Sequence, residues 1–319
     1  MSPPAPGVPL ILLAGSDRRQ GTVPAEARNL RFLKGYKGAD LKIQGRPLAE
    51  CLLERVRESR GFAPVYLAGP ERIFGSIVDC EVIDTDGHVG ENIRAGVDFV
   101  LKRHGPRSPV GIMACDILPR ADEIQEMVGL LLDPGAHPGE TLEVGLAMSL
   151  IRADRDLGAS SWKPRYGIRP TPSEAPVPFL PSHLGIAWPH RLRLGLLFKL
   201  LRLAYRERNR DYSRRQRTIF LRIIGALLAR DFSSLLRFRP PIVTYMVLRY
   251  GLSAFSLWRR GELDLDRLCF SFGAVFVKRK YLRRWGSRCV RLVTSDSVAF
   301  AKDIDTEEEL RELETEQGP

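Results

Sequence analysis

The sequence predicts an α/β protein built on a mixed, mostly parallel sheet with helices on both faces. Two observations lead to this prediction. Strand-like and helix-like segments alternate along the first half of the chain, as they do in layered α/β folds. Several of the strand-like segments are apolar throughout, which is typical of parallel strands that are buried on both faces.

The first half of the chain supplies the alternating segments. The strands stand out as short apolar runs between Gly, Pro and polar residues, and the helices as apolar residues that recur at helical spacing. We expect strands at 8–14, 64–68, 80–84, 109–114 and 141–151, and helices at 47–57, 91–103 and 121–132.

The second half of the chain is less regular. Residues 160–189 are rich in Pro, Ser and Gly, and we expect a loop there. After this segment we expect basic helices at 192–205 and 218–236, a mixed segment at 263–278, a strand at 289–294 and a closing helix at 306–316. Thr306 and Glu309 have the spacing of a capping box, which favours a helix start at this point.

The segments group into three parts of the chain. Residues 1–159 are expected to form a nucleotide-binding α/β core. Residues 160–262 are expected to be an insertion made of the loop and the basic helices, facing an acceptor or a membrane. Residues 263–319 are expected to complete the core, and the length of 319 residues is sufficient for such a domain.

The composition excludes several classes of protein. Hydrophobic residues make up 44% and charged residues 27%, which is typical of a folded globular chain and not of a disordered one. No apolar window is long enough to span a membrane, and the run 8–14 is too short for a signal peptide. The five cysteines form no CxxC pair, which favours reduced thiols and a cytoplasmic location.

The net charge of +11 is concentrated in one segment. Residues 191–249 contain fifteen Lys and Arg but only three acidic residues, so the rest of the chain is close to neutral. One interpretation is that these are helices packed by an apolar face, with their arginines in solvent. The segment could instead bind an anionic membrane surface or a phosphorylated acceptor. Nucleic acid is an unlikely partner, because no recognised binding module accompanies the charge.

Asp116 is the first candidate metal ligand. It follows the apolar strand 109–114, and ligands of parallel α/β sheets bind beyond the carboxyl ends of the strands. An ionised carboxylate at the end of a buried strand must be solvated, paired or bound to a metal. The alternative is that Asp116 only caps the helix that begins near Ala121, or forms an Asx turn.

Asp303 and Asp305 are the second candidate metal-binding group. They are two residues apart, so in an extended segment their side chains point to the same side. Mg²⁺ binds few carboxylates together with phosphate oxygens of a substrate, so one aspartate from each group could hold it. The alternative is a solvated acidic face near the C-terminal end.

Five motifs occur in the order seen in one known family. They are LILLAGS from Leu10, KGADLKIQGRPLAECLLERV from Lys37, GENIRAGVDFV from Gly90, MACDILPR from Met113 and DIDTEEELREL from Asp303. In these motifs the chain resembles the MobA-like nucleotidyltransferases, over about 8–150 and 288–314. The resemblance implies a three-layer fold of the nucleotide-diphospho-sugar transferase type, also called glycosyltransferase-A-like. It also implies Mg²⁺-dependent transfer of a nucleotidyl group from a nucleoside triphosphate to a phosphorylated small-molecule or lipid-precursor acceptor, with release of pyrophosphate.

The resemblance also implies roles for individual residues. It assigns nucleotide binding to Ala14, Gly15, Ser16, Arg18 or Arg19, Gly90 and Asn92, a catalytic cation to Arg18 and Lys37, and metal binding to Asp116 and Asp305, with Asp303 as the alternative second ligand.

The phosphate-binding loop departs from the family pattern, and two questions stay open. Asp17 places an anion in the loop, and Gly38 stands where the family has a lysine, with Lys37 one residue away and Lys42 four residues beyond. Either lysine could supply the cation. The alternative to an enzyme is a catalytically degenerate nucleotide-binding scaffold, located at the inner membrane surface as a peripheral protein.

Overall fold

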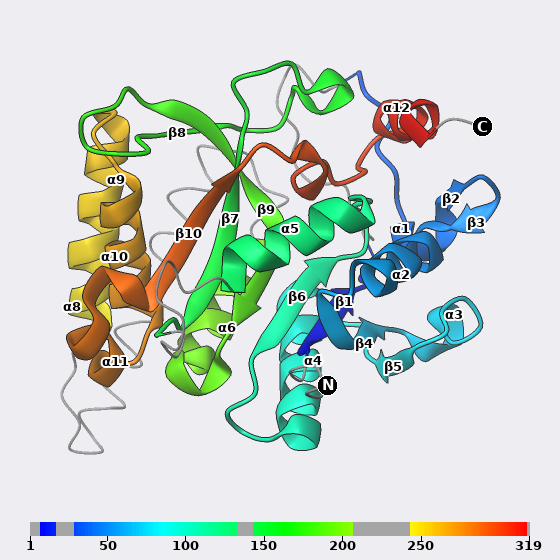
Figure 1. Ribbon diagram of the computed structural model, residues 1–319, viewed down its shortest axis with the longest axis horizontal. Helices are drawn as coiled ribbons and strands as arrows, with labels where there is room; N and C mark the ends of the chain where they lie inside the picture. The colour runs from blue at the N-terminus through cyan, green and yellow to red at the C-terminus, as the bar shows by residue number, and fades with distance from the viewer. Residues whose placement is uncertain (1–6, 17–28, 133–142, 207–242, 318–319) are drawn as a thin grey trace, which may run out of the picture.

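The computed structural model describes residues 7–16, 29–132, 143–206 and 243–317. Its centre is an eight-stranded sheet with the order β10-β7-β9-β6-β1-β4-β5, to which β8 is added at β9 (Figure 1). The strands are β1 (Val8–Leu13), β4 (Phe62–Gly69), β5 (Glu81–Asp84), β6 (Val110–Ala114), β7 (Leu146–Arg152), β8 (Tyr166–Ile168), β9 (Val177–Ala187) and β10 (Val290–Ser295). A two-stranded hairpin of β2 (Lys42–Ile43) and β3 (Arg46–Pro47) stands apart from this sheet.

The sheet is mixed and mostly parallel, as the sequence predicts. Strand β1 pairs in parallel with β4 and β6, β4 with β5, and β7 with β10. Strand β9 is antiparallel to both β6 and β7 and lies between them. The parallel strands explain the continuous apolar runs, since Leu10, Ile11 and Leu12 of β1 are fully buried on alternate faces of the sheet.

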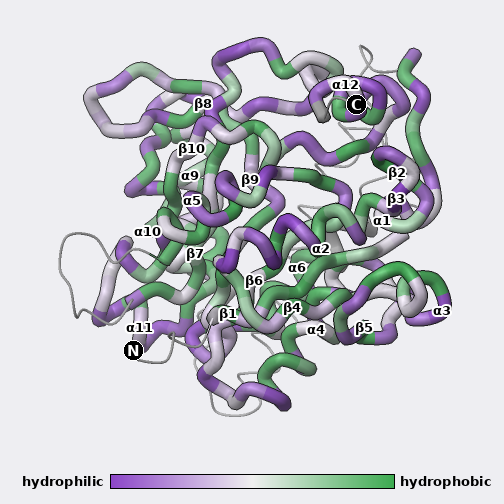
Figure 2. The backbone as a smooth tube through the Cα atoms, turned by 45° about the vertical axis from the view of Figure 1, so that its right-hand side comes forward, coloured by the Kyte–Doolittle hydropathy of each residue, from purple (hydrophilic) through white to green (hydrophobic). Residues whose placement is uncertain are grey.

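Helices cover both faces of the sheet, giving three layers. On one face α2 (Leu48–Ser59) and α5 (Ala121–Leu132) pack in the main hydrophobic core. On the other face lie α4 (Val89–His104), α6 (Leu194–Arg206) and α10 (Leu265–Phe276). Figure 2 shows the hydrophobic residues gathered on the central strands, whereas the outer α12 is mostly hydrophilic. The remaining helices are α1 (Lys37–Asp40), α3 (Glu71–Phe74), α8 (Val243–Met246), α9 (Leu252–Arg259), α11 (Arg279–Trp285) and α12 (Glu307–Gln317).

The prediction of a loop at 160–189 is wrong. This range contains β8 and the long strand β9, which lies in the middle of the sheet. Pro178 and Pro181 make β9 hard to recognise as a strand from the sequence, because proline cannot donate a hydrogen bond to a neighbouring strand. Pro181 lies where the register with β7 shifts, and Pro178 pairs with the short strand β8 and accepts a hydrogen bond of 2.9 Å from Ala153 N–H, just after β7. The sheet therefore accommodates the prolines at an irregular position and beside a short strand.

The closing helix begins as predicted. Glu309 N–H donates to the Thr306 hydroxyl at 3.2 Å, and Thr306 N–H donates to the Glu309 carboxylate at 3.0 Å. The mixed segment at 263–278 is largely the single helix α10. The helix expected at 218–236 lies outside the described residues.

The division into 1–159, 160–262 and 263–319 remains a prediction. Strand β9 belongs to the middle part and is nevertheless a strand of the central sheet. Among the helices of the described residues, none combines the length and the apolar composition that crossing a membrane requires.

Candidate functional site

The site is organised by the carboxyl ends of β1 and β6. These two strands are parallel neighbours, and Leu13 pairs with Ala114 where both strands end. The Cys115 N–H donates to the Leu13 carbonyl at 3.1 Å and continues this pairing by one residue. The chain segments that leave the two strands, at Gly15 and at Asp116, therefore start side by side at one edge of the sheet.

Three aspartates lie together at this edge. One carboxylate oxygen from each of Asp116, Asp303 and Asp305 lies within 4.8 Å of those of the other two. The C-terminal segment reaches the sheet by a backbone hydrogen bond of 2.8 Å from Ile304 N–H to the Asp116 carbonyl. Because Ile304 stands between Asp303 and Asp305, this one contact brings both carboxylates to Asp116. The two carboxylate groups that the sequence analysis selected are thus neighbours in space.

Lys37 is the lysine that faces these carboxylates. Its ammonium group donates a hydrogen bond to Oδ1 of Asp305 and lies 3.7 Å from Oδ2 of Asp116. Its side chain is only 4% exposed. Lys42, the other lysine that the sequence left open, is an exposed residue of β2. The geometry therefore favours Lys37 as the cation of this site.

Gly38 explains how Lys37 approaches the sheet so closely. A Cβ atom added at Gly38 would lie 2.9 Å from Sγ of Cys115, which is closer than packed atoms tolerate. The absence of a side chain at Gly38 lets α1 lie against the segment that follows β6. The glycine at position 38 thus helps to place Lys37 beside Asp116.

Asp303 is surrounded by cationic groups of its own. Its Oδ1 lies 2.5 Å from Nζ of Lys163 and 3.4 Å from Nε2 of His183. Burial alone would raise the pKa of Asp303, but the charges of His183 and Lys163 outweigh it and hold that pKa well below its usual range. Burial likewise opposes the charge of Lys163, whose pKa is nevertheless raised by Asp303 and Glu309. Asp303 is therefore a stable carboxylate already balanced by cations.

The electrostatic surroundings of Asp305 differ from those of Asp303. Burial and the negative charge of Asp303 raise the pKa of Asp305 to about 6, against the opposing effect of Lys37. A carboxyl group that is buried beside another carboxylate gains when further positive charge approaches. Asp305 therefore has more to gain electrostatically from a bound cation than Asp303 has.

A cavity of about 290 Å³ opens beside the aspartates. It is lined by Leu13, Gly15, Ser16, Lys37, Gly87, Val89, Asn92, Ala114, Cys115, Asp116, His183 and Asp303. The buried side chain of Asn92 accepts hydrogen bonds at its Oδ1 from the Thr85 hydroxyl, at 3.0 Å, and from Gly87 N–H, at 3.1 Å. A Cβ atom at Gly15 would lie 3.4 Å from Nδ2 of Asn92, so the amide group of Asn92 faces the segment after β1.

The other residues selected from the sequence lie at different positions. Ala14 is fully buried and its N–H donates to the Ala68 carbonyl at 2.9 Å, so it ends β1 and does not line the cavity. Gly90 is buried in the first turn of α4, beside the cavity-lining Val89. Arg18 and Arg19 lie outside the described residues.

Three residues of the site have no signal in the sequence analysis. Lys163 and His183 come from the segment that was expected to be a loop, and His183 is on β9. Glu309 was expected only to cap α12, yet its Oε1 lies 3.1 Å from Nζ of Lys163 and accepts a hydrogen bond of 2.7 Å from Ser160. Recognising β9 as a strand is the one step that would have brought His183 to the same edge of the sheet.

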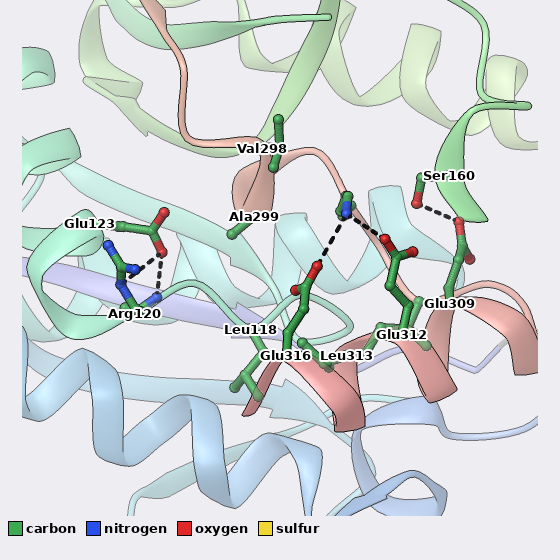
Figure 3. A pocket seen from close by; sticks show the side chains of 12 residues that line it. Leu118, Arg120, Glu123, Ser160, Val298, Ala299, Glu309, Glu312, Leu313 and Glu316 are labelled. Atoms are coloured by element: carbon green, nitrogen blue, oxygen red, sulfur yellow. Dashed lines mark hydrogen bonds and ion pairs between the residues drawn. The ribbon is translucent and has the colours of Figure 1, made fainter. Parts of the chain in front are cut away.

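A second cavity, of about 310 Å³, lies on the α12 side of this network (Figure 3). Arg120 and Glu123 line one side, and Glu312 and Glu316 of α12 line the other. Lys302 lies 3.2 Å from Glu312 and 3.6 Å from Glu316, so much of the charge around this cavity is paired within its own lining. The three aspartates are not part of this lining, and we assign the functional site to the cavity beside Gly15.

The residues present suit a divalent cation. Carboxylate oxygens are the ligands that Mg²⁺ prefers, and it is usually bound by one or two of them together with phosphate oxygens. Asp116 and Asp305 would supply the carboxylates, and the cavity beside them has room for further ligands. Asp303 lines the cavity and is the alternative second ligand; Lys163 and His183 contact it, as Lys37 contacts Asp305.

Comparisons with known proteins find similarity in shape alone. Neither the protein-family profiles nor the curated proteins give a match. Among solved structures, the chain is similar to CMP:2-keto-3-deoxy-manno-octonic acid synthetase complexed with CTP, with 12% identity, a TM-score of 0.45 and 98% coverage of each chain. It is also similar to 4-diphosphocytidyl-2C-methyl-D-erythritol synthase from Anaerococcus prevotii, with 11% identity, a TM-score of 0.43 and coverage of 98% and 99%.

A further structure of 4-diphosphocytidyl-2C-methyl-D-erythritol synthase has 11% identity, a TM-score of 0.35 and coverage of 61% of this chain and 79% of its own. At these identities and TM-scores the resemblance is one of shape, and the activities of these enzymes do not follow for this chain. The function must be argued from the site itself.

Proposed function

We propose that the chain is a nucleotidyltransferase of the MobA-like type, which transfers a nucleotidyl group from a nucleoside triphosphate to a phosphorylated acceptor. The observation that carries this proposal is the convergence of Asp116 and Asp305 at the carboxyl edge of a parallel sheet, beside the cavity that Gly15 and Ser16 line. Carboxylates that lie next to backbone N–H groups after a strand suit a triphosphate with its cation.

The chemistry of the proposed reaction is one displacement at phosphorus. An oxygen of the acceptor phosphate attacks the α-phosphorus in line, the bond from the α-phosphorus to the bridging oxygen breaks, and pyrophosphate leaves with the electron pair of that bond. Mg²⁺ held by Asp116 and Asp305 would stabilise the negative charge on the phosphate oxygens.

Other residues of the chain would bind the triphosphate and orient it. The backbone after β1, at Gly15 and Ser16, would receive the triphosphate, and the amide of Asn92 would fix its position from the side of α4. Lys37 would place a positive charge on the phosphates, since it lines the same cavity. Such positioning of reactants and charges supplies most of the rate enhancement in transfers of this kind.

Pyrophosphate release tests the proposal. The chain is incubated with each of the common nucleoside triphosphates, Mg²⁺ and a panel of phosphorylated sugars, alcohols and lipid precursors. We expect release that depends on both the triphosphate and the acceptor, and that falls on the order of 100-fold or more in Asp116→Asn. The matched control is Asp122→Asn, which neutralises an exposed aspartate in the same part of the chain. Full turnover in Asp116→Asn would remove Asp116 from the mechanism.

A catalytically degenerate nucleotide-binding scaffold is the second candidate function. The departure of the loop sequence from the family pattern, with the acidic Asp17 directly after Ser16, supports it. Such a protein would bind triphosphates without releasing pyrophosphate. A thermal-shift measurement with each triphosphate and Mg²⁺ separates the two candidates, because a ligand that binds only the native state raises the apparent stability.

We further propose that the chain works in the cytoplasm at the inner membrane surface, where a lipid-precursor acceptor would be found. Exposed apolar side chains and arginines occur together on one side of the molecule: Leu252 and Phe255 of α9 are each 47% exposed, and Arg259 at the end of the same helix is exposed as well. Apolar side chains flanked by arginine are suited to the interface of an anionic bilayer. The larger basic segment extends through residues outside the described ranges.

A further inference from the structure

Lys37 occupies the space between two carboxylates that would bind a divalent cation. Its ammonium group contacts Asp305 and lies 3.7 Å from Asp116. We propose that Lys37 is an internal counter-ion that keeps metal away from these aspartates until a triphosphate gives the lysine another anionic partner. This inference rests on the proposed function, because it assigns an order to the binding of metal and nucleotide at the same site.

The distances place the lysine and the metal in competition for the same two carboxylates. The carboxylate oxygens of Asp116 and Asp305 lie within 4.8 Å of each other. A Mg²⁺ ion that binds both would lie about 2.1 Å from each oxygen, which is deeper between them than an ammonium group can reach. An ammonium nitrogen in contact with the same oxygens would then face a divalent charge at close range. On this proposal the ammonium group moves away from the carboxylates when the metal binds, because the two positive charges repel each other.

Hydrogen bonds and packing hold the backbone around Lys37 in place. The exchange of partners proposed for Lys37 therefore requires its side chain to move. The carbonyl of Lys37 accepts a hydrogen bond of 3.0 Å from Leu41 N–H, and Gly38 packs against Cys115. On the other side of α1, the Tyr36 hydroxyl donates to Asp86 at 2.9 Å and receives a hydrogen bond from Arg72 at 3.1 Å. Movement of the ammonium group therefore requires rotation of the lysine side chain, without displacement of α1.

The cavity offers a destination for the lysine side chain. Lys37 lines the same cavity as Gly15 and Ser16, where the proposed function places the triphosphate. A phosphate group in this cavity would replace the carboxylates as the partner of Lys37, and Asp116 and Asp305 would then be available to the metal. Metal and nucleotide should therefore each strengthen the binding of the other, as reciprocal linkage between two sites requires.

Asp303 shows why this role belongs to Lys37 and not to a neighbouring lysine. Lys163 binds Asp303 at 2.5 Å and also Glu309 at 3.1 Å, so these two partners of its ammonium group do not include Asp116 or Asp305. His183 also contacts Asp303, at 3.4 Å, and Asp303 favours its protonated form. Lys37, in contrast, contacts both of the aspartates that would hold the metal.

The first test measures metal binding without nucleotide. Mn²⁺ alone is titrated into the full chain, and free Mn²⁺ is followed by electron paramagnetic resonance. We expect Lys37→Gln to bind Mn²⁺ at least about tenfold more tightly than the wild type, because the competing charge is gone. Lys34→Gln removes the same charge from an exposed lysine three residues earlier and should leave the affinity unchanged. Lys37→Met repeats the measurement with a second neutral side chain in case the glutamine variant folds poorly.

The second test measures whether Lys37 contributes to phosphate binding. Inorganic tripolyphosphate is titrated without metal and followed by calorimetry, and we expect Lys37→Gln to bind it at least about tenfold more weakly, with Lys34→Gln as the control. Equal Mn²⁺ affinity in the wild type and Lys37→Gln overturns the counter-ion role and leaves the proposed function standing. Mn²⁺ binding to none of the variants, either alone or with tripolyphosphate present, overturns both. Unchanged tripolyphosphate binding overturns the exchange between carboxylate and phosphate.

Discussion

The ammonium nitrogen of Lys163 lies 3.1 Å from Oε1 of Glu309, and this contact joins the segment before β8 to the first turn of α12. Lys163 also holds Asp303, and Glu309 also accepts hydrogen bonds from Ser160 and from the backbone N–H of Asp305. The position of the two C-terminal aspartates therefore depends on a buried ion network. The geometry of the candidate site and the stability of the fold share these residues.

Lys163→Met should destabilise the protein strongly. The substitution leaves Asp303 and Glu309 buried without their shared cation. Removal of one partner of a buried ion pair lowers the free energy of unfolding by about 3–5 kcal/mol. The free energy of unfolding from urea titration measures the effect. Lys302→Met is the matched control, because Lys302 pairs with Glu312 and Glu316 at the more exposed surface of α12, where an ion pair contributes about 1 kcal/mol or less. Similar losses in both variants would show that the Lys163 network does not stabilise the fold specially.

Gly38→Ala should destabilise the protein through contact with one atom. The added methyl group would meet Sγ of Cys115 at 2.9 Å, and overpacking of this kind costs about 1–3 kcal/mol. In a Cys115→Ala background the sulfur is absent, so the same substitution should cost much less. Urea unfolding of the two single variants and the double variant gives the coupling energy, which we expect at about 0.5–3 kcal/mol. Additive losses would mean that Gly38 is required for another reason.

Asn92 allows stability and phosphate binding to be separated. Asn92→Ala leaves the Thr85 hydroxyl and Gly87 N–H without their acceptor, which should cost about 1–3 kcal/mol of unfolding free energy. Asn92→Asp keeps an acceptor for both donors but buries a carboxylate, so its unfolding free energy is measured beside that of Asn92→Ala. It also replaces the amide nitrogen that faces Gly15 by a second anionic oxygen, so tripolyphosphate binding should weaken by about tenfold, measured by calorimetry. Unchanged binding in Asn92→Asp would place the phosphates elsewhere.

Much of this fold is predictable because its parallel strands are uniform in sequence. The runs at 8–14 and 109–114 are apolar throughout, and helix α2 buries Leu48, Leu52 and Val56 at helical spacing. Local patterns of this kind identify an element without knowledge of its partners. Strand β9 lacks such a pattern because its prolines are tolerated only through a shifted register and a short neighbouring strand, and both are properties of the assembled sheet.

The candidate site is predictable to the extent that its residues end strands. Asp116 follows an apolar strand, and Asp303 and Asp305 lie just before a capping box, so all three could be selected from local sequence. Lys163 and His183 could not, because they reach the site through the position of β9 in the sheet. The choice between Lys37 and Lys42 likewise depends on how α1 packs against Cys115, which the spacing of the lysines does not reveal.

The exposed face of α9 leads to a prediction about membrane association. Leu252→Ser together with Phe255→Ser removes two half-exposed apolar side chains and should change the unfolding free energy little, since neither residue is buried. If this face meets an anionic bilayer, co-sedimentation with phosphatidylglycerol vesicles should fall by about tenfold in the double variant, because buried apolar area contributes to interfacial binding.

Wild-type binding should also weaken when salt is raised from about 0.1 M to about 1 M, since screening shortens the reach of the arginine charges. Neutral phosphatidylcholine vesicles are the control for the charge. Equal sedimentation of wild type and double variant with anionic vesicles would exclude α9 as the contact, and no sedimentation of the wild type would exclude the membrane as a partner.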